Sequence, residues 1–155
     1  MNPRNTKTYE KYENMQPATQ IKQPILKRDD LVYPELSYKI VGCAFEVFKE
    51  LGYGHPEKVY QKAMAILFDE RKIPYTKEEY VPIKFRNVLL RKQFIDFVVE
   101  NKIVVELKKN FHFSKAHIDQ VLYYMQEKNV QLSILINFGK EGATFKRIVN
   151  VKEKA

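Results

Sequence analysis

Two short apolar segments of this 155-residue chain carry two carboxylates and an amine that could act together in chemistry. Asp96 lies within FIDFVV at 94–99, and Glu106 and Lys108 lie within IVVELK at 103–108. A pair of carboxylates suits Mg²⁺, which completes an octahedral oxygen shell with water and substrate phosphate. A lysine beside such a pair can orient an attacking water and offset charge that develops on the phosphate. The alternative is a solvent-exposed strand face with no catalytic role, on which Glu-x-Lys is frequent.

The hydrophobic pattern of the two segments predicts how they pair. Each segment alternates with period two, so its odd-numbered residues share one face, namely Ile95, Phe97 and Val99 in the first and Ile103, Val105 and Leu107 in the second. Burying both sets together requires a hairpin with a three-residue loop at 100–102. The expected pairs are Val99 with Ile103, Phe97 with Val105, and Ile95 with Leu107. This register sets Asp96 directly opposite Glu106 with Lys108 on the same face, and opposed carboxylates repel unless a cation or proton lies between them.

The rest of the chain predicts helices around these strands. Apolar residues recur at helical spacing from Pro34 to Gly52 and again from about 56 to 72. A change to period two then predicts a meander of three strands, followed by a third helix and two more strands. The expected ranges are 80–87, 92–99 and 103–108 for the meander, 115–128 for the helix, and 132–138 and 143–149 for the last strands. The predicted order of elements is therefore ααβββαββ.

The composition indicates one folded domain. Hydrophobic residues make up 45% of the chain, and no run of about 18 apolar residues exists. With a polar N-terminus, we expect no membrane span, no secretory signal and a cytoplasmic location. The single cysteine, Cys43, cannot form an intrachain disulfide, and three scattered histidines make no zinc cluster, so a metal would need oxygen ligands. Residues 1–33, which are polar and contain three prolines, predict a flexible leader, and 34–155 the folded domain.

The net charge of +8 favours a polyanionic partner such as nucleic acid. Most of the excess lies after residue 35, in the part expected to fold. Four basic residues cluster on the first two strands of the meander: Lys84, Arg86, Arg91 and Lys92. They either follow a phosphate backbone or form an ordinary solvated strand surface.

Three further groups of residues lie where a site could use them. In GHPEKVY, the motif Gly54-x-x-Glu57-x-x-Tyr60 places a carboxylate in the first turn of the second helix and a tyrosine one turn further along the same side. Gln120 and Tyr124 are spaced i and i+4 on the third helix, off its apolar stripe. On the same helix, His117 lies one turn before Gln120, and NFG at 137–139 closes a buried strand.

Taken together, these motifs closely resemble those of the GxxExxY protein family, a branch of the PD-(D/E)XK nuclease superfamily. The resemblance covers about residues 35–150 and rests on GHPEKVY, FIDFVVE, IVVELK, HIDQVLYY and NFG followed by KRIVN. It implies an α/β fold with a restriction-endonuclease-like core, in which a mixed central sheet is flanked by helices. One departure is that Ile95, not proline, precedes the aspartate.

The resemblance also implies roles for individual residues. Asp96 and Glu106 match the superfamily's Mg²⁺ ligands, with Mn²⁺ as a substitute ion. Glu57 is similar to a frequent third acidic member of such sites, and Lys108 matches the amine that assists the water nucleophile. The residues expected to border the site and contact substrate or metal-bound water are Gln120, Tyr124, Tyr60 and His117.

The expected function is therefore that of a Mg²⁺-dependent nuclease, which hydrolyses phosphodiester bonds in nucleic acid, with DNA favoured over RNA. The alternative is a non-catalytic nucleic-acid-binding module that retains the nuclease fold, because a fold does not by itself determine function. Superfamily members often dimerise to cut two strands, so a homodimer is a further expectation. A membrane is not an expected partner.

Overall fold

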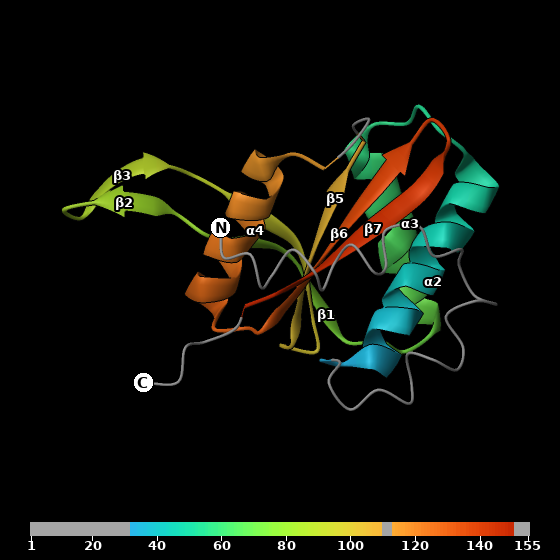
Figure 1. Ribbon diagram of the computed structural model, residues 1–155, viewed down its shortest axis with the longest axis horizontal. Helices are drawn as coiled ribbons and strands as arrows, with labels where there is room; N and C mark the ends of the chain where they lie inside the picture. Colours follow the sequence, from blue (N-terminus) through green and yellow to red (C-terminus); the bar gives the residue numbers. More distant parts are fainter. Residues whose placement is uncertain (1–31, 110–112, 151–155) are drawn as a thin grey trace.

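A computed structural model describes residues 32–109 and 113–150, which form a mixed α/β domain (Figure 1). Three helices are present in this part of the chain: α2 (Pro34–Leu51), α3 (Glu57–Glu70) and α4 (Lys115–Lys128). The strands are β1 (Tyr75–Tyr80), β2 (Ile83–Phe85), β3 (Val88–Arg91), β4 (Phe94–Val99), β5 (Ile103–Lys108), β6 (Leu132–Gly139) and β7 (Gly142–Val149). The leader predicted for 1–33 lies almost wholly outside the described residues.

Five strands form the main sheet in the order β1-β4-β5-β6-β7, and β2 and β3 form a separate two-stranded sheet. Only β5 and β6 run parallel; the other neighbours in the main sheet are antiparallel. A parallel pair needs a crossover connection, and α4 supplies it between β5 and β6. The expected mixed sheet flanked by helices is thus confirmed. The order of the helices and main-sheet strands matches the predicted ααβββαββ.

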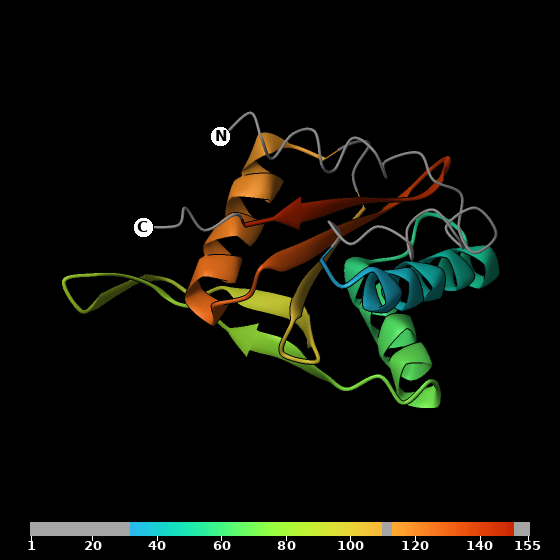
Figure 2. The ribbon, with the colours of Figure 1, turned by 60° about the horizontal axis from the view of Figure 1, so that its bottom comes forward.

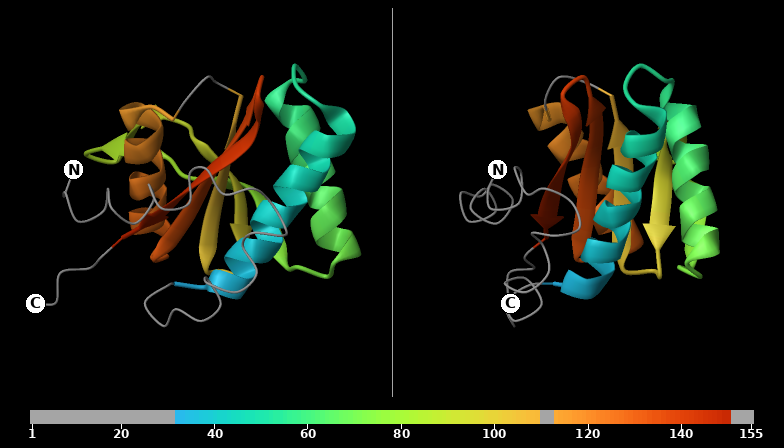
Figure 3. Two further views of the ribbon diagram at one scale, coloured as in Figure 1. Left: turned by 45° about the vertical axis from the view of Figure 1, so that its right-hand side comes forward. Right: turned by 90° about the vertical axis from the view of Figure 1, so that its right-hand side faces the viewer.

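The helices cover both faces of the sheet, as Figures 2 and 3 show. On one face, α2 and α3 pack against a cluster that includes Phe97, Val105 and Ile134. On the other face, α4 packs against a cluster that includes Val104 and Leu135. Because β5 and β6 are covered on both sides, they are almost entirely buried, which accounts for their nearly continuous apolar sequences.

The ends of the helices follow local sequence signals. Pro34 is the first residue of α2, where a proline costs no helical hydrogen bond. The helix ends before Gly52, whose φ of 71° is a conformation that glycine adopts readily. Ser114 caps α4, since its hydroxyl accepts a hydrogen bond from the His117 backbone N–H. The helix expected at 115–128 has the predicted bounds.

One predicted strand is wrong. The range 80–87 is expected from the sequence to begin the meander, but the strand that pairs with β4 is β1, at Tyr75–Tyr80. Pro82 has no N–H to donate to a ladder, so the run breaks there and continues as β2. Arg86 and Asn87 both have positive φ and turn the chain into β3, which the sequence pattern does not predict. The stretch from 83 to 91 is therefore a hairpin outside the main sheet.

No helix in the two described ranges has the length and apolarity that a membrane crossing requires.

Candidate active site

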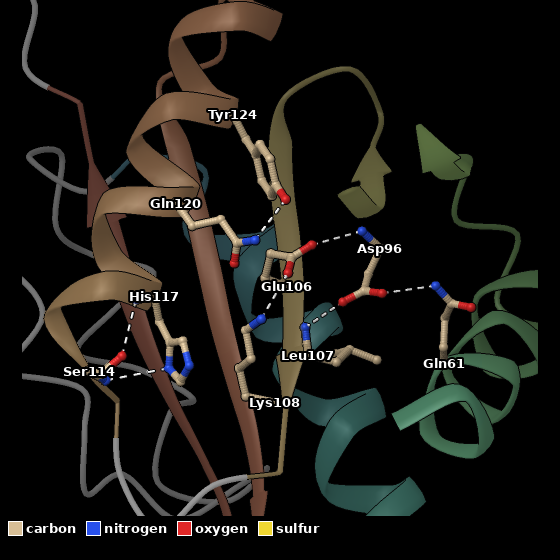
Figure 4. A network of polar contacts seen from close by, with 9 residues as sticks. All are labelled: Gln61, Asp96, Glu106, Leu107, Lys108, Ser114, His117, Gln120 and Tyr124. Atoms are coloured by element: carbon tan, nitrogen blue, oxygen red, sulfur yellow. Dashed lines mark hydrogen bonds and ion pairs between the residues drawn. The ribbon is translucent and has the colours of Figure 1, made fainter. Parts of the chain in front are cut away.

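Asp96 and Glu106 hold the two central strands of the site together through their side chains. The predicted pairs Val99–Ile103 and Phe97–Val105 are both present, and the ladder between β4 and β5 ends there. At the next position, the Asp96 backbone N–H donates to Glu106 Oε1 at 2.9 Å, and the Leu107 backbone N–H donates to Asp96 Oδ2 at 2.9 Å (Figure 4). Carboxylates thus take the place of main-chain acceptors. The prediction that this strand pair brings the two acids together is confirmed.

The predicted face of Ile95 is wrong. Phe97 and Val99 pack on the α2–α3 side, as does Leu107, but Ile95 packs in the cluster on the α4 side. The expected pair Ile95–Leu107 is absent from the register. Strict alternation fails because the ladder is interrupted at Asp96, and the β1–β4 register also passes over Asp96, where Glu78 has a φ of 56°. The irregularity frees the Asp96 carboxylate to reach Leu107 and α3.

Lys108 supplies a positive charge to the pair. Its Nζ lies 3.6 Å from Glu106 Oε2, and both side chains are largely buried. Burial, and then the negative charge of Asp96, raise the pKa of Glu106 to about 8. Burial also raises the pKa of Asp96, against hydrogen bonds and the charge of Lys108, which lower it. The two carboxylates therefore carry an electrostatic cost when both are ionised, and a bound cation would relieve it.

Helix α3 contributes Glu57 and a residue that sequence reasoning missed, Gln61. The Gln61 side-chain Nε2 donates to Asp96 Oδ1 at 2.9 Å, and Gln61 is almost fully buried. Glu57 opens the same helix one turn earlier and lines the same cavity as Asp96 and Glu106. A signal for Gln61 was present in the sequence, because it follows Glu57 by four residues and so lies on the same side of the helix.

Helix α4 brings Gln120 and Tyr124 to the same cavity from the opposite face of the sheet. The Gln120 Nε2 donates to Tyr124 Oη at 2.9 Å (Figure 4). The prediction that Tyr124 lies off the apolar stripe is wrong, because it is 1% exposed and packs in the core beneath α4. Burial, and then the negative charge of Glu106, raise the pKa of Tyr124. Its hydroxyl therefore stays protonated and can donate a hydrogen bond at neutral pH.

Two predicted site residues lie elsewhere. Tyr60 is fully buried and stacks on Phe138 with ring centroids 4.2 Å apart. Its hydroxyl donates to the Gly52 carbonyl at 2.6 Å, so it holds the turn before α3 instead of facing the carboxylates. His117 accepts a hydrogen bond from the Ser114 backbone N–H at 3.4 Å, which completes the cap of α4. It lines a neighbouring cavity of about 430 Å³ and does not line the one that holds Asp96.

The cavity around the carboxylates has a volume of about 300 Å³ and a mixed charge. Its acidic residues are Glu57, Glu78, Asp96 and Glu106, and its basic residues are Lys58, Arg91, Lys92 and Lys108. Lys58 and Glu78 are paired with each other. Arg91, together with Gln93, Lys108 and Gln120, also lines the neighbouring cavity, so the two hollows adjoin and share these residues. Acidic groups suited to a cation and basic groups suited to a phosphate thus line one hollow.

The donor set fits a hard divalent cation. Mg²⁺ is bound in proteins through one or two carboxylates and keeps several waters, which is what Asp96 and Glu106 can offer. Each carboxylate oxygen that accepts one hydrogen bond retains a second lone pair. Within residues 32–109 and 113–150, no three His, Cys, Asp or Glu side chains gather as a metal-holding group. Glu57 accordingly does not join the pair as a third ligand in this structure, and its metal role stays a prediction.

The sequence and the structure were compared with known protein families, curated proteins and solved structures. The family model described as PD-(D/E)XK nuclease superfamily matches residues 34–148, which is most of the chain. No curated protein matches the sequence. A solved structure named "Crystal structure of SSO0001" is similar with 15% identity and a TM-score of 0.46. The similarity covers 78% of this chain and 59% of that one, so this chain spans less than two thirds of that protein's length.

Proposed function

We propose that this chain, which belongs to the PD-(D/E)XK nuclease superfamily, is a Mg²⁺-dependent nuclease that hydrolyses phosphodiester bonds in DNA. The observation that carries the proposal is the cross-bonded pair of Asp96 and Glu106 with Lys108 beside it, at the wall of a cavity. Members of this superfamily generally depend on a divalent metal. Mn²⁺ is the expected substitute ion.

Asp96 and Glu106 are the proposed metal ligands. Their main-chain hydrogen bonds fix both carboxylates, and the Gln61 amide fixes the remaining oxygen of Asp96. A divalent cation bound there would make a coordinated water more acidic and offset the charge on a phosphate oxygen. Because the protein holds the ligands in place beforehand, little reorganisation is needed when substrate arrives.

Lys108 is the proposed partner of the attacking water. Its Nζ is close to Glu106 yet not fully enclosed, since the side chain keeps 16% of its exposure and lines both hollows. From this place it can donate a hydrogen bond to a water or to a phosphate oxygen at the carboxylates. Gln120 and Tyr124 border the same cavity and can donate hydrogen bonds to substrate from the α4 side.

Within the superfamily, we assign the chain to the GxxExxY type by the Gly54-x-x-Glu57-x-x-Tyr60 motif. The positions of its residues support separate roles for the parts of this motif. Glu57 lines the cavity, whereas Tyr60 holds the preceding turn through the Gly52 carbonyl. The motif would therefore place an acid at the site and fix the loop that positions it.

The test is cleavage of supercoiled plasmid, linear DNA and single-stranded RNA with Mg²⁺, Mn²⁺ or EDTA. Wild-type protein should cleave DNA only with a divalent ion. Asp96→Asn and Lys108→Met should each lower the cleavage rate by roughly 100-fold or more. This exceeds the effect of about 10–100-fold that is typical of residues that only hydrogen-bond a metal ligand. Lys109→Met, a change of the same kind at the neighbouring exposed residue, is the matched control and should cleave like wild type.

Two results would overturn the proposal. Cleavage that Asp96→Asn leaves unchanged would show that another site is responsible. Folded wild-type protein that binds DNA in a salt-sensitive way, but cleaves none of the polymers with either ion, would favour the alternative of a non-catalytic binding module. Urea unfolding of each variant shows whether a loss of cleavage comes from a loss of fold.

A further inference from the structure

The hairpin of β2 and β3, residues 83–91, projects away from the main sheet and is called here the β2–β3 arm (Figures 1 and 2). Every residue of β3 is exposed. Phe85 and Val88 are paired across the arm, and Leu90 lies where the register shifts; they are 61%, 62% and 63% exposed. Contiguous apolar side chains left in water on a projecting element mark a binding surface more often than a structural one.

The charge on the arm points to the kind of partner. From Val81 to Gln93 the chain carries four basic residues and no acidic residue. The basic residues are Lys84, Arg86, Arg91 and Lys92. A surface that combines basic and apolar side chains without a single acid is complementary to a polyanion with apolar groups between its charges. DNA has this character, because its phosphates flank grooves that expose base edges and thymine methyl groups.

The root of the arm is attached firmly beside the candidate active site. The Val81 backbone N–H donates to the Gln93 carbonyl at 2.7 Å, and the Tyr123 hydroxyl of α4 donates to the Pro82 carbonyl at 3.2 Å. Arg91 and Gln93 line the cavity that holds the carboxylates. A polymer held by the arm would therefore lie next to that cavity.

The length of the β2–β3 arm favours the major groove of duplex DNA as its binding site. A four-residue strand at about 3.3 Å per residue spans roughly 13 Å. The major groove of B-form DNA, about 12 Å wide and 8.5 Å deep, admits a two-stranded β-ribbon. The major groove of A-form RNA is too narrow for side chains to read. A ribbon of this length can therefore reach base edges through the major groove of duplex DNA, but not through the major groove of duplex RNA.

We propose that the β2–β3 arm enters the major groove of duplex DNA, with Lys84 and Arg86 on the phosphates and the apolar residues Phe85 and Leu90 against the base edges. The cleavage step that would follow rests on the proposed function, because the bound duplex then presents a backbone phosphate to Asp96 and Glu106. The arm thus selects the duplex form of the substrate, whereas the carboxylates act on its phosphate.

The test measures binding of a labelled 20-base-pair DNA duplex and its RNA counterpart by fluorescence anisotropy over a range of KCl concentrations. All proteins carry Asp96→Asn and are measured with Mg²⁺, so that the DNA is not consumed. The charge variant is Lys84→Ala with Arg86→Ala, and the apolar variant is Phe85→Ser with Leu90→Ser. Lys49→Ala with Lys140→Ala removes the same charge from exposed positions on α2 and in the β6–β7 turn and is the matched control.

For the DNA duplex, the charge variant should reduce the slope of log K against log salt by about 1.8, or about 0.9 for each phosphate that the protein no longer neutralises. The apolar variant should weaken binding by about tenfold or more with the slope unchanged. Both variants should bind the RNA duplex like the control. Equal losses on DNA and RNA overturn the assignment to the major groove, and variants that bind DNA like the control overturn the arm as a DNA-binding element.

Sedimentation of the apolar variant distinguishes a second copy of the chain from DNA as the occupant. A wild-type dimer that this variant converts to a monomer, with DNA binding unchanged, overturns the proposal in favour of an interface between copies. The cleavage assay on wild-type protein is independent of all these outcomes. If the arm variants lose DNA binding and the wild-type protein is inactive, the arm is sustained as a DNA-binding element and the nuclease is rejected. If the wild-type protein cleaves DNA and the arm variants bind DNA like the control, the arm alone is rejected.

Discussion

At the scale of single residues, the site depends on side chains that replace main-chain partners. The Asp96 carboxylate accepts the Leu107 N–H and the Glu106 carboxylate accepts the Asp96 N–H. Each acid is thus held by the strand that carries the other. Removing either side chain leaves a backbone N–H of the central strand pair without its acceptor, so truncation to alanine would damage structure as well as chemistry. Variants that keep the shape, such as Asp96→Asn, separate the two effects better.

The hydrogen bond from Gln61 to Asp96 leads to a prediction about positioning. Gln61→Met keeps the volume of the side chain and removes the amide that donates to Asp96 Oδ1. Loss of a residue that hydrogen-bonds a metal ligand typically lowers metal affinity or activity by about 10–100-fold. We therefore expect Mn²⁺ affinity and the cleavage rate of Gln61→Met to fall by about that factor. Calorimetric titration of Mn²⁺ measures the affinity directly. Lys62→Met, at the exposed neighbouring position, is the control, and an unchanged Mn²⁺ affinity in Gln61→Met would refute a positioning role.

At the scale of elements, Tyr60 links α3 to the turn that precedes it. Tyr60→Phe keeps the stacking on Phe138 and removes two hydrogen bonds, the one donated to the Gly52 carbonyl and the one accepted from the His55 backbone N–H. We expect the free energy of unfolding to fall by about 2 kcal/mol, at a typical net contribution of about 1 kcal/mol for each hydrogen bond. Cleavage should remain close to wild type, because Tyr60 does not line the cavity. Urea unfolding and the plasmid assay check both points; a 100-fold loss of cleavage at unchanged stability would place Tyr60 in the site after all.

The ion pair between Glu79 of β1 and Lys128 of α4 predicts a pH dependence. Burial tends to raise the pKa of Glu79, but hydrogen bonds from Lys128 and Thr76 outweigh burial and lower it. A lowered pKa in the folded state contributes stability above the unfolded value, about 4.3, and this contribution is lost as the pH falls through the folded value. Glu79→Gln should therefore be less stable than wild type at pH 7, and this difference should shrink as the pH falls below about 4. Urea midpoints from pH 3 to 7 test this, and a difference that stays constant over that range would contradict it.

At the scale of the whole molecule, metal binding and folding should be coupled. The carboxylate pair exists only when β4 and β5 are paired, so an ion that binds it stabilises the folded state. An ion at about 100 times its dissociation constant should add roughly 2.7 kcal/mol to the free energy of unfolding. Thermal unfolding with and without Mn²⁺ measures this. Wild-type protein should melt at a higher temperature with the ion, and Asp96→Asn should not; an equal rise in both would show binding elsewhere.

Much of the fold could be predicted from the sequence because its signals are local. Period two in FIDFVV and IVVELK, with three residues between them, is enough to determine the hairpin and the pairs Val99–Ile103 and Phe97–Val105. The bounds of α4 follow from a Ser cap and an apolar stripe. The proximity of Asp96 and Glu106 follows from that register, so the centre of the candidate site was predictable without the structure.

The tertiary structure decided which residues share the cavity, because that depends on how separate elements pack. Helix spacing puts Glu57, Tyr60 and Gln61 within about one turn, yet only Glu57 and Gln61 reach the cavity of the carboxylates. Periodicity cannot show that the ladder stops at Asp96, where side chains satisfy the backbone and Ile95 changes face. Nor can it show that residues 83–91 leave the sheet beside the cavity, since an exposed hairpin and a sheet strand have the same alternation. Local order is encoded over a few residues, and the site is assembled from interactions that only the folded chain makes.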